Sequence, residues 1–320
     1  MYPATSSKSN FTVSFSGHET FPFRYGWLKK GIDAVTQDPT LFASEQAMAK
    51  MGVGKNMVRS IRHWCLAAGL IREESRAGAV RGQLTATALG KKLLFDNGFD
   101  PYLEDPATLW LIHWQITSNI SAATTWFWAF NYWNVAEFTK EVFISELRAW
   151  LANGPYKQVA ENSLKRDADC FVRTYVQSRY HRGPVSEDTL DCPLVDLHLL
   201  AELADGKTYQ FQRGGQPSLP DEIFIYSLIE FWRASGQMGN TLAFEKIAYE
   251  AGSPGRIFKL NEDSLSDRLE RIETISNGLY GYDETSGLKQ IYKRSEAELE
   301  PMELLKTYYR KSKAVKTRAA

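Results

Sequence analysis

A short acidic stretch holds the residues best suited to binding a metal ion. Glu187, Asp188 and Asp191 lie within five positions of one another, and Asp196 follows closely. Carboxylate oxygens gathered in a turn suit Mg²⁺ or Mn²⁺, and such a cation can activate water for hydrolysis. Two interpretations stay open: Glu187, Asp188 and Asp191 form a catalytic metal site, or one of them caps the following turn and the others are solvated.

A second set of charged residues lies on a helix that we expect to begin near residue 163. Lys165 and Arg166 suit a clamp for a phosphate group of DNA. Asp167 and Asp169 point in different directions from a helix, which argues against a shared metal site. Asp169 and Arg173 are four residues apart, so an exposed ion pair is the simpler interpretation for them.

A third set comprises His18, Glu19 and Arg24. A histidine beside a carboxylate could act as a general base and its orienting group. Adjacent residues of an extended segment point to opposite sides, however, so they seldom share one proton path. The alternative is that His18 and Arg24 fix this loop by hydrogen bonds against the winged helix that is predicted below for residues 41–95.

Other chemistry has little support in the sequence. Cys65, Cys170 and Cys192 are widely spaced, which fits small buried residues in a reducing cytoplasm better than a metal site. No phosphate-binding Walker loop and no signal peptide are recognisable. No apolar run is long enough to cross a membrane, so we expect a cytoplasmic protein.

The elements that would position these groups begin with a helix-turn-helix pattern. Ser44 can cap a first helix, Gly52 and Gly54 supply a turn, and residues 55–70 repeat apolar side chains at helical spacing. Strand, turn, strand and closing helix follow. We therefore predict a winged helix-turn-helix over residues 41–95.

This segment carries a net charge of +6, whereas the whole chain is neutral. A helix-turn-helix places the start of its second helix in the major groove, and a wing contacts phosphates or the minor groove. We therefore expect double-stranded DNA to be the ligand. The expected contacts on the second helix are Lys55, Asn56, Arg59, Arg62 and His63. Those in the wing are Arg76 and Arg81.

The middle of the chain is rich in tryptophan. Six of the nine tryptophans are Trp110, Trp114, Trp126, Trp128, Trp133 and Trp150. They could form a platform for unpaired bases or a bulky helical core. The core is favoured, because basic residues are almost absent from residues 99–151. A small hairpin is expected at 206–217, with YQFQ as a strand and RGGQ as its turn.

The last third of the chain repeats the pattern of helices and wing strands predicted for residues 41–95, but without the net positive charge. A helix over 219–232 precedes helices and two wing strands at 278–284 and 288–294, and residues 240–294 carry a net charge of −1. We predict a mainly α fold of the α+β class. Its expected divisions are a DNA-binding domain (1–95), a helical middle domain (96–218), a winged-helix-like domain (219–305) and a basic tail (306–320).

Four long segments carry a family resemblance: SGHETFPFRYGWLKKG (16–31), SLKRDADCFVRTYV (163–176), EDTLDCPLVDLHLL (187–200) and IFKLNEDSL (257–265). They resemble the SspB-like family, an uncharacterised-domain family encoded beside DNA phosphorothioation genes. The resemblance implies a DNA-nicking component in antiphage defence, with sulfur placed on one strand. It also implies a cysteine desulfurase, an ATP pyrophosphatase and an ATPase as partners.

Two classes of function therefore remain. In the first, the chain is a nicking endonuclease that uses Mg²⁺ or Mn²⁺ at Glu187, Asp188 and Asp191 and holds DNA additionally through Lys165 and Arg166. In the second, it is a specificity or recruitment subunit without activity of its own, or a transcriptional regulator.

Overall fold

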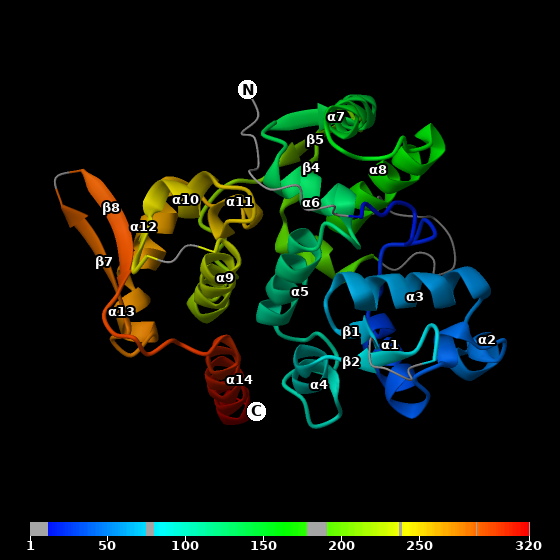
Figure 1. Cartoon of the computed structure of the whole chain (residues 1–320), viewed down its shortest axis with the longest axis horizontal. Coiled ribbons are helices and arrows are strands. Elements are labelled where there is room, and N and C mark those ends of the chain that lie inside the picture. The colour runs from blue at the N-terminus through cyan, green and yellow to red at the C-terminus, as the bar shows by residue number, and fades with distance from the viewer. Residues whose placement is uncertain (1–11, 75–79, 178–190, 237–238, 286, 320) are drawn as a thin grey trace.

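The chain folds into helices and three small antiparallel sheets, as a computed structural model shows (Figure 1). The structure describes residues 12–74, 80–177, 191–236, 239–285 and 287–319. The predicted α+β fold with mainly helical content is confirmed. None of the helices in these ranges is long and apolar enough to cross a membrane.

The N-terminal elements follow the expected order. They are α1 (Trp27–Gln37), η1 (Leu41–Ala43), α2 (Ala47–Met51), α3 (Lys55–Ala67), β1 (Ile71–Glu73), β2 (Leu84–Ala86) and α4 (Ala88–Leu94). Gly52 adopts φ +65° in the turn between α2 and α3, a conformation that glycine takes without strain. The apolar side of α3 packs on α1, where a Cβ on Gly31 would lie 2.4 Å from Cys65 Sγ. This close approach leaves the charged side of α3 facing outward.

The middle elements build a core dense in aromatic side chains. They are α5 (Pro106–Ser118), α6 (Thr124–Asn131), β3 (Glu137–Thr139), α7 (Lys140–Asn153), α8 (Glu161–Tyr175), η3 (Pro193–Leu197), β4 (Leu200–Glu202) and β5 (Thr208–Phe211). Of the six tryptophans between residues 99 and 151, five are at most 5% exposed, and Trp150 alone is half-buried. For these five, the core interpretation fits the structure.

The turn of the hairpin expected at 206–217 was predicted at the wrong residues. The strand YQFQ is β5, but it pairs with β4 before it and with the distant β3. The turn lies at Asp205, whose carboxylate accepts hydrogen bonds from the backbone N–H groups of Lys207 and Thr208. The RGGQ segment instead makes a parallel bridge between Gly214 and Leu260.

The C-terminal elements contain the third small sheet, together with helices. They are α9 (Asp221–Ala234), β6 (Thr241–Ala243), α10 (Phe244–Tyr249), α11 (Pro254–Ile257), α12 (Glu262–Glu270), α13 (Ile272–Ile275), β7 (Tyr280–Thr285), β8 (Leu288–Lys293) and α14 (Pro301–Ala319). The sheet order is β6-β8-β7, so the predicted wing strands pair as neighbours.

The segment expected to be a basic tail is helical through Ala319. Helix α14 packs on α9, and the Tyr309 ring stacks on Phe99 at 4.9 Å. The hydroxyls of Tyr309 and Thr108 are hydrogen-bonded at 2.7 Å. These contacts return the end of the chain to the start of the middle elements. Leu304, Leu305 and Tyr309 form the buried side of this basic helix.

The three groups of elements share one core. Buried apolar side chains form a single cluster that runs from Phe23 to Tyr309. In Figure 1, α2 and α3 lie at one end of the molecule and β7 and β8 at the other, with α5 and α9 between them. Side chains of both ends are therefore held by the same set of central helices.

Candidate nucleic-acid interface and carboxylate site

The outward side of α3 presents the cations expected from the sequence. Lys55, Asn56 and Arg59 are exposed, and the Arg62 side chain is 35% exposed. Gly54 precedes the helix and has no side chain to cap its first N–H groups. A helix N-terminus with free N–H groups and adjacent cations attracts phosphate.

Two surface ion pairs hold the arginines of this face. Arg59 Nη1 lies 3.1 Å from Glu19 Oε1, and Arg62 Nη2 lies 2.8 Å from Glu73 Oε1. Exposed pairs of this kind contribute about 0–1 kcal/mol, so a phosphate can replace either carboxylate at little cost. In the wing, Arg81 is exposed, whereas Arg76 lies outside the described residues.

His63 does not belong to this cationic face. Its ring lies beside the rings of His18 and Trp64, and a Cβ on Gly17 would lie 2.5 Å from its Nδ1. Burial, with smaller contributions from the nearby His18 and Arg62, lowers the pKa of His63 to about 3. The lowered pKa favours the uncharged ring, and the side chain is half-buried, so His63 differs from the exposed cations of α3 and its role as a DNA contact stays a prediction.

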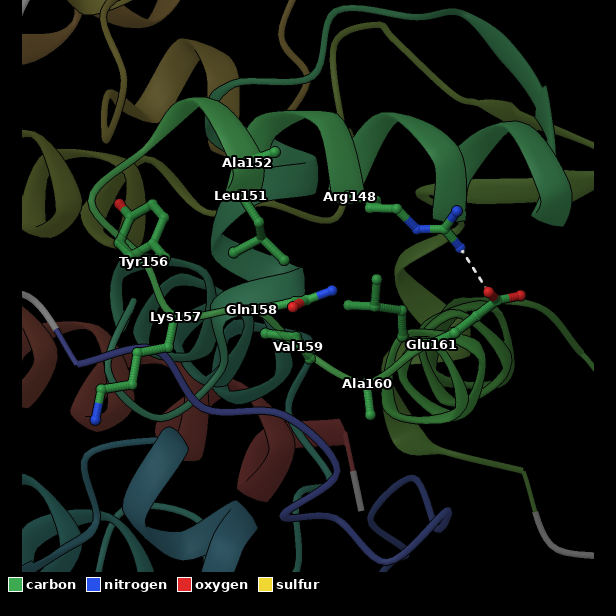
Figure 2. A pocket seen from close by; sticks show the side chains of 10 residues that line it. Arg148, Leu151, Ala152, Tyr156, Lys157, Gln158, Val159, Ala160 and Glu161 are labelled. Carbon is green, nitrogen blue, oxygen red and sulfur yellow. Dashed lines mark ion pairs between the residues drawn. The ribbon is translucent and has the colours of Figure 1, made fainter.

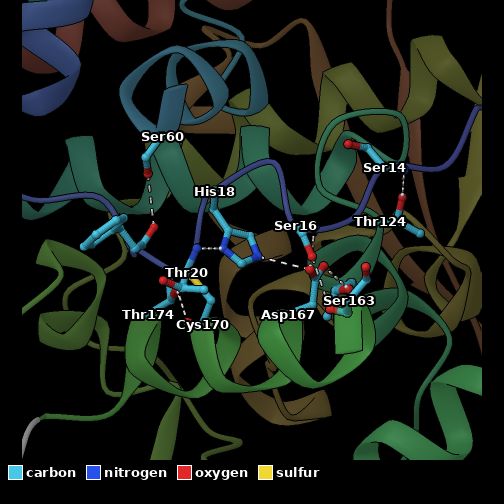
Figure 3. A network of polar contacts seen from close by, with 12 residues as sticks. Ser14, Ser16, His18, Thr20, Ser60, Thr124, Ser163, Asp167, Cys170 and Thr174 are labelled. Atoms are coloured by element: carbon cyan, nitrogen blue, oxygen red, sulfur yellow. Dashed lines mark hydrogen bonds and ion pairs between the residues drawn. The ribbon is translucent and has the colours of Figure 1, made fainter. Parts of the chain in front are cut away.

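Behind α3, residues 12–20 form a strap that is fixed to α8 by one buried carboxylate (Figure 3). Asp167 Oδ1 accepts hydrogen bonds from the Ser16 N–H at 2.7 Å and from His18 Nε2 at 3.1 Å. Asp167 Oδ2 accepts one from the Thr125 hydroxyl at 2.7 Å. His18 Nδ1 accepts from the Thr20 N–H at 3.1 Å, which places the ring proton on Nε2.

This arrangement gives His18 a structural role, and no catalytic role is needed to explain its position. The side chain is 1% exposed, and both ring nitrogens are hydrogen-bonded within the protein. Ser16, Glu19 and Thr20 all have positive φ, a strained conformation that persists only where other contacts enforce it. The structure thus fits the interpretation that His18 fixes the loop, but its distant partner is Asp167 on α8 and not a residue of the predicted winged helix.

The charged residues of α8 lie on the surface near this junction. Lys165 pairs with Glu161 at 2.9 Å, and Arg166 is exposed. Asp169 pairs with Lys140 at 2.6 Å and not with Arg173. Lys165 and Arg166 are therefore available to a ligand, but the described contacts do not join them to α3.

The carboxylates proposed to bind a metal are described only in part. Glu187 and Asp188 lie outside the described residues. Asp191 is half-buried, and Asp196 accepts a hydrogen bond from the Tyr25 hydroxyl at 3.0 Å. Burial, followed by this hydrogen bond, raises the pKa of Tyr25 to about 12.

Asp191 and Asp196 both lie near the buried thiol of Cys192. Both carboxylates add to the effect of burial in raising the pKa of the Cys192 thiol between them. Asp196 and Tyr25 line a hollow of about 350 Å³. Within the described ranges, no three acidic, histidine or cysteine side chains are grouped as metal ligands, so these residues alone do not complete a site.

Hydrogen bonds connect all four family-like segments. His18 and Tyr25 join residues 16–31 to α8 and to Asp196, respectively. His113 links α8 to the fourth segment, 257–265: its Nε2 donates to the Ile257 carbonyl at 3.0 Å, and its Nδ1 accepts from the Tyr175 hydroxyl at 2.9 Å. Sequence reasoning missed His113, because it is a single histidine in an almost entirely apolar helix.

Comparison with known proteins identifies a family and two similar crystal structures. Residues 15–309 match the family described as proteins of unknown function, DUF4007. The SspB crystal structure is 30% identical to this chain, with a TM-score of 0.80. A magnesium ion-bound SspB crystal structure is also 30% identical and has a TM-score of 0.81. Each match covers 91% of this chain and 85% of SspB. No curated protein matches the chain.

Proposed function

This chain belongs to the DUF4007 family and has the fold of SspB, and on that premise we propose that it is a DNA-binding and DNA-nicking component of a single-strand phosphorothioation system. Its setting is antiphage defence. Its partners are double-stranded DNA and the cysteine desulfurase, ATP pyrophosphatase and ATPase of the system. The single observation that carries the proposal is the exposed cationic side of α3.

In this proposal, α3 lies against the DNA backbone as the recognition helix of a winged helix-turn-helix. Lys55, Asn56 and Arg59 contact base edges or phosphates near the helix N-terminus, with Arg62 exchanging Glu73 for a phosphate. Arg76 and Arg81 contact the backbone from the wing. Lys165 and Arg166 provide further phosphate contacts from α8.

Strand cleavage is assigned to the carboxylates at 187–191. Glu187, Asp188 and Asp191 provide hard oxygen ligands, and a bound Mg²⁺ or Mn²⁺ would lower the pKa of a water molecule and offset charge on the phosphate. The magnesium ion-bound SspB structure supports this choice of cation. Asp196, which follows them in the chain, accepts a hydrogen bond from the Tyr25 hydroxyl.

A recruitment subunit is the second candidate, and one surface favours it. The exposed side of α12 carries Glu262, Asp263, Asp267 and Glu270. This side faces solvent with a charge opposite to that of α3, so it would repel DNA and attract a basic partner protein.

A plasmid assay separates these candidates. We expect purified protein, alone or with the partner proteins, to convert supercoiled plasmid to open circles when Mg²⁺ or Mn²⁺ is present. Asp191→Asn should abolish conversion, whereas Asp283→Asn, at an exposed carboxylate of β7, should not. DNA binding without any conversion, under all of these conditions, would leave the recruitment role.

A further inference from the structure

Three cations gather where the segment after β5 meets the end of α11. The Gly214 N–H donates to the Lys259 carbonyl at 3.0 Å, and the Lys259 N–H donates to the Arg256 carbonyl at 3.2 Å. These bonds bring Arg213, Arg256 and Lys259 together, and we call them the cation cluster. Within the described part of the chain, none of the three forms an ion pair with a carboxylate.

Lys259 is an unusual member of this cluster. Its side chain is 5% exposed, and its Nζ lies 4.3 Å from the centre of the Phe211 ring and 5.0 Å from that of Phe130. Burial, followed by the charges of Arg256 and Arg213, lowers the pKa of Lys259 to about 7. A buried cation without a carboxylate destabilises a fold, so a bound anion would relieve both unfavourable effects.

A stack of aromatic rings begins beside the cation cluster. Asn131, the neighbour of Tyr132, accepts a hydrogen bond from the Gly252 N–H at 2.6 Å, which joins the end of α6 to the segment before α11. The Arg256 charge accordingly opposes the pKa increase that burial causes at Tyr132. The Tyr132 and Trp150 ring centres are 5.8 Å apart, and those of Trp150 and Tyr156 are 4.9 Å apart. All three rings are half-buried, and we call them the ring stack.

The ring stack ends at a hollow between α7 and α8 (Figure 2). The hollow has a volume of about 660 Å³, and Tyr156 forms part of its wall. Leu151, Val159 and Leu164 provide an apolar lining. Arg148 lies at its edge, paired with Glu161 at 3.2 Å. A flat, uncharged group such as a nucleobase fits an apolar hollow beside an aromatic ring.

We propose that the cation cluster and the ring stack form a binding site for single-stranded DNA, distinct from the duplex-binding face of α3. Phosphates would lie on the exposed Arg213 and the half-buried Arg256, with the charge of the buried Lys259 behind them, and bases would stack on the rings without sequence preference. An aromatic platform in residues 99–151 looks improbable from sequence because cations are almost absent there, but the fold brings further cations in from residues 213–259. The inference rests on the proposed function, since a nick frees a strand that can leave the duplex.

The test is binding of a fluorescent oligothymidylate of about 12 nucleotides, a length within the range that single-strand sites cover. Fluorescence anisotropy should show that Tyr156→Leu and Lys259→Met each weaken binding about tenfold, as expected for loss of one stacking or phosphate contact. Lys259→Met should also reduce the slope of log affinity against log salt by about 0.7. Matched controls, Tyr292→Leu on β8 and Lys92→Ala on α4, should bind like the wild type.

Unchanged affinity in both site variants would overturn the proposal. So would equal binding of an abasic oligomer, because the site would then recognise only an anion. Duplex binding, measured in parallel, separates this inference from the proposed function. Loss of strand binding with intact duplex binding supports two separate sites. Wild-type failure to bind duplex, with strand binding retained and sensitive to Tyr156→Leu, would remove the proposed function and leave this site standing.

Discussion

Replacing Asp167 by asparagine should destabilise the protein far more than the same change at Asp169, two residues along the same helix. Asp167 is buried and accepts three hydrogen bonds from the strap and from α6. Asp169 is exposed and has one surface ion pair with Lys140. The two substitutions remove the same charge from α8, so their difference isolates the buried junction.

The magnitude follows from the three partners of Asp167. An asparagine oxygen can still accept from Ser16 and His18, and the Thr125 hydroxyl can rotate to accept from the new amide. What is lost is the ionic character of two hydrogen bonds, about 1 kcal/mol each. We therefore expect Asp167→Asn to lower the free energy of unfolding by about 2 kcal/mol. Asp169→Asn should lower it by about 0–1 kcal/mol, the range for surface ion pairs.

Urea unfolding followed by circular dichroism measures both values under one set of conditions. The Asp167→Asn midpoint should fall with the slope unchanged, because the surface exposed on unfolding stays the same. Asp167→Ala should be worse, since it leaves two buried N–H donors without an acceptor, at about 1–3 kcal/mol each. Equal midpoints for Asp167→Asn and Asp169→Asn would refute the reasoning that the strap is held by this carboxylate.

Three further predictions concern the same surfaces. Glu19→Gln should free Arg59 and remove a negative charge beside the DNA, so duplex affinity in a filter-binding assay should rise about two- to fivefold; a fall would show that Glu19 itself contacts the ligand. Lys259→Met should raise the free energy of unfolding at pH 6. The pKa of Lys259 in the folded protein is about 7, below the ordinary 10.5, so burying its charge lowers the free energy of unfolding. This cost is fully present below pH 7 and disappears as the pH rises to 10.5. The gain, on the order of 2–5 kcal/mol, should vanish near pH 10.5 in thermal melts, and a variant less stable at pH 6 would contradict it. Gly17→Ala should force its Cβ against the His63 ring and cost about 1–3 kcal/mol in unfolding free energy, whereas a neutral result would mean that the strap can shift away from α3.

The helix α3 was predictable because its determinants are local. Apolar side chains recur at helical spacing, Gly52 permits the turn before it, and the cations fall on the opposite side. The strands that follow pair with each other over a short connection, so their register needs no distant partner. The spacing of apolar residues and the glycine in the turn were therefore sufficient to predict this part of the fold.

Contacts between distant segments could not be predicted in the same way. Asp167 on an amphipathic helix has no local sign that it will meet His18, 149 residues earlier. The pairing of β5 with β3 depends on a segment about 70 residues away, which explains the error in the hairpin. His63 lies at the edge of the polar side of α3, and only the approach of Gly17 decides that its ring turns inward.

The most direct test of the account is the salt dependence of duplex binding by a charge-matched pair of double variants. Lys55→Ala with Arg59→Ala removes two cations from α3, and Lys91→Ala with Lys92→Ala removes two exposed cations from α4. The first pair should weaken binding and reduce the slope of log affinity against log salt by about two, while the second should change neither. If both pairs bind like the wild type, or the α4 pair alone weakens binding, the cationic side of α3 is not where the DNA lies.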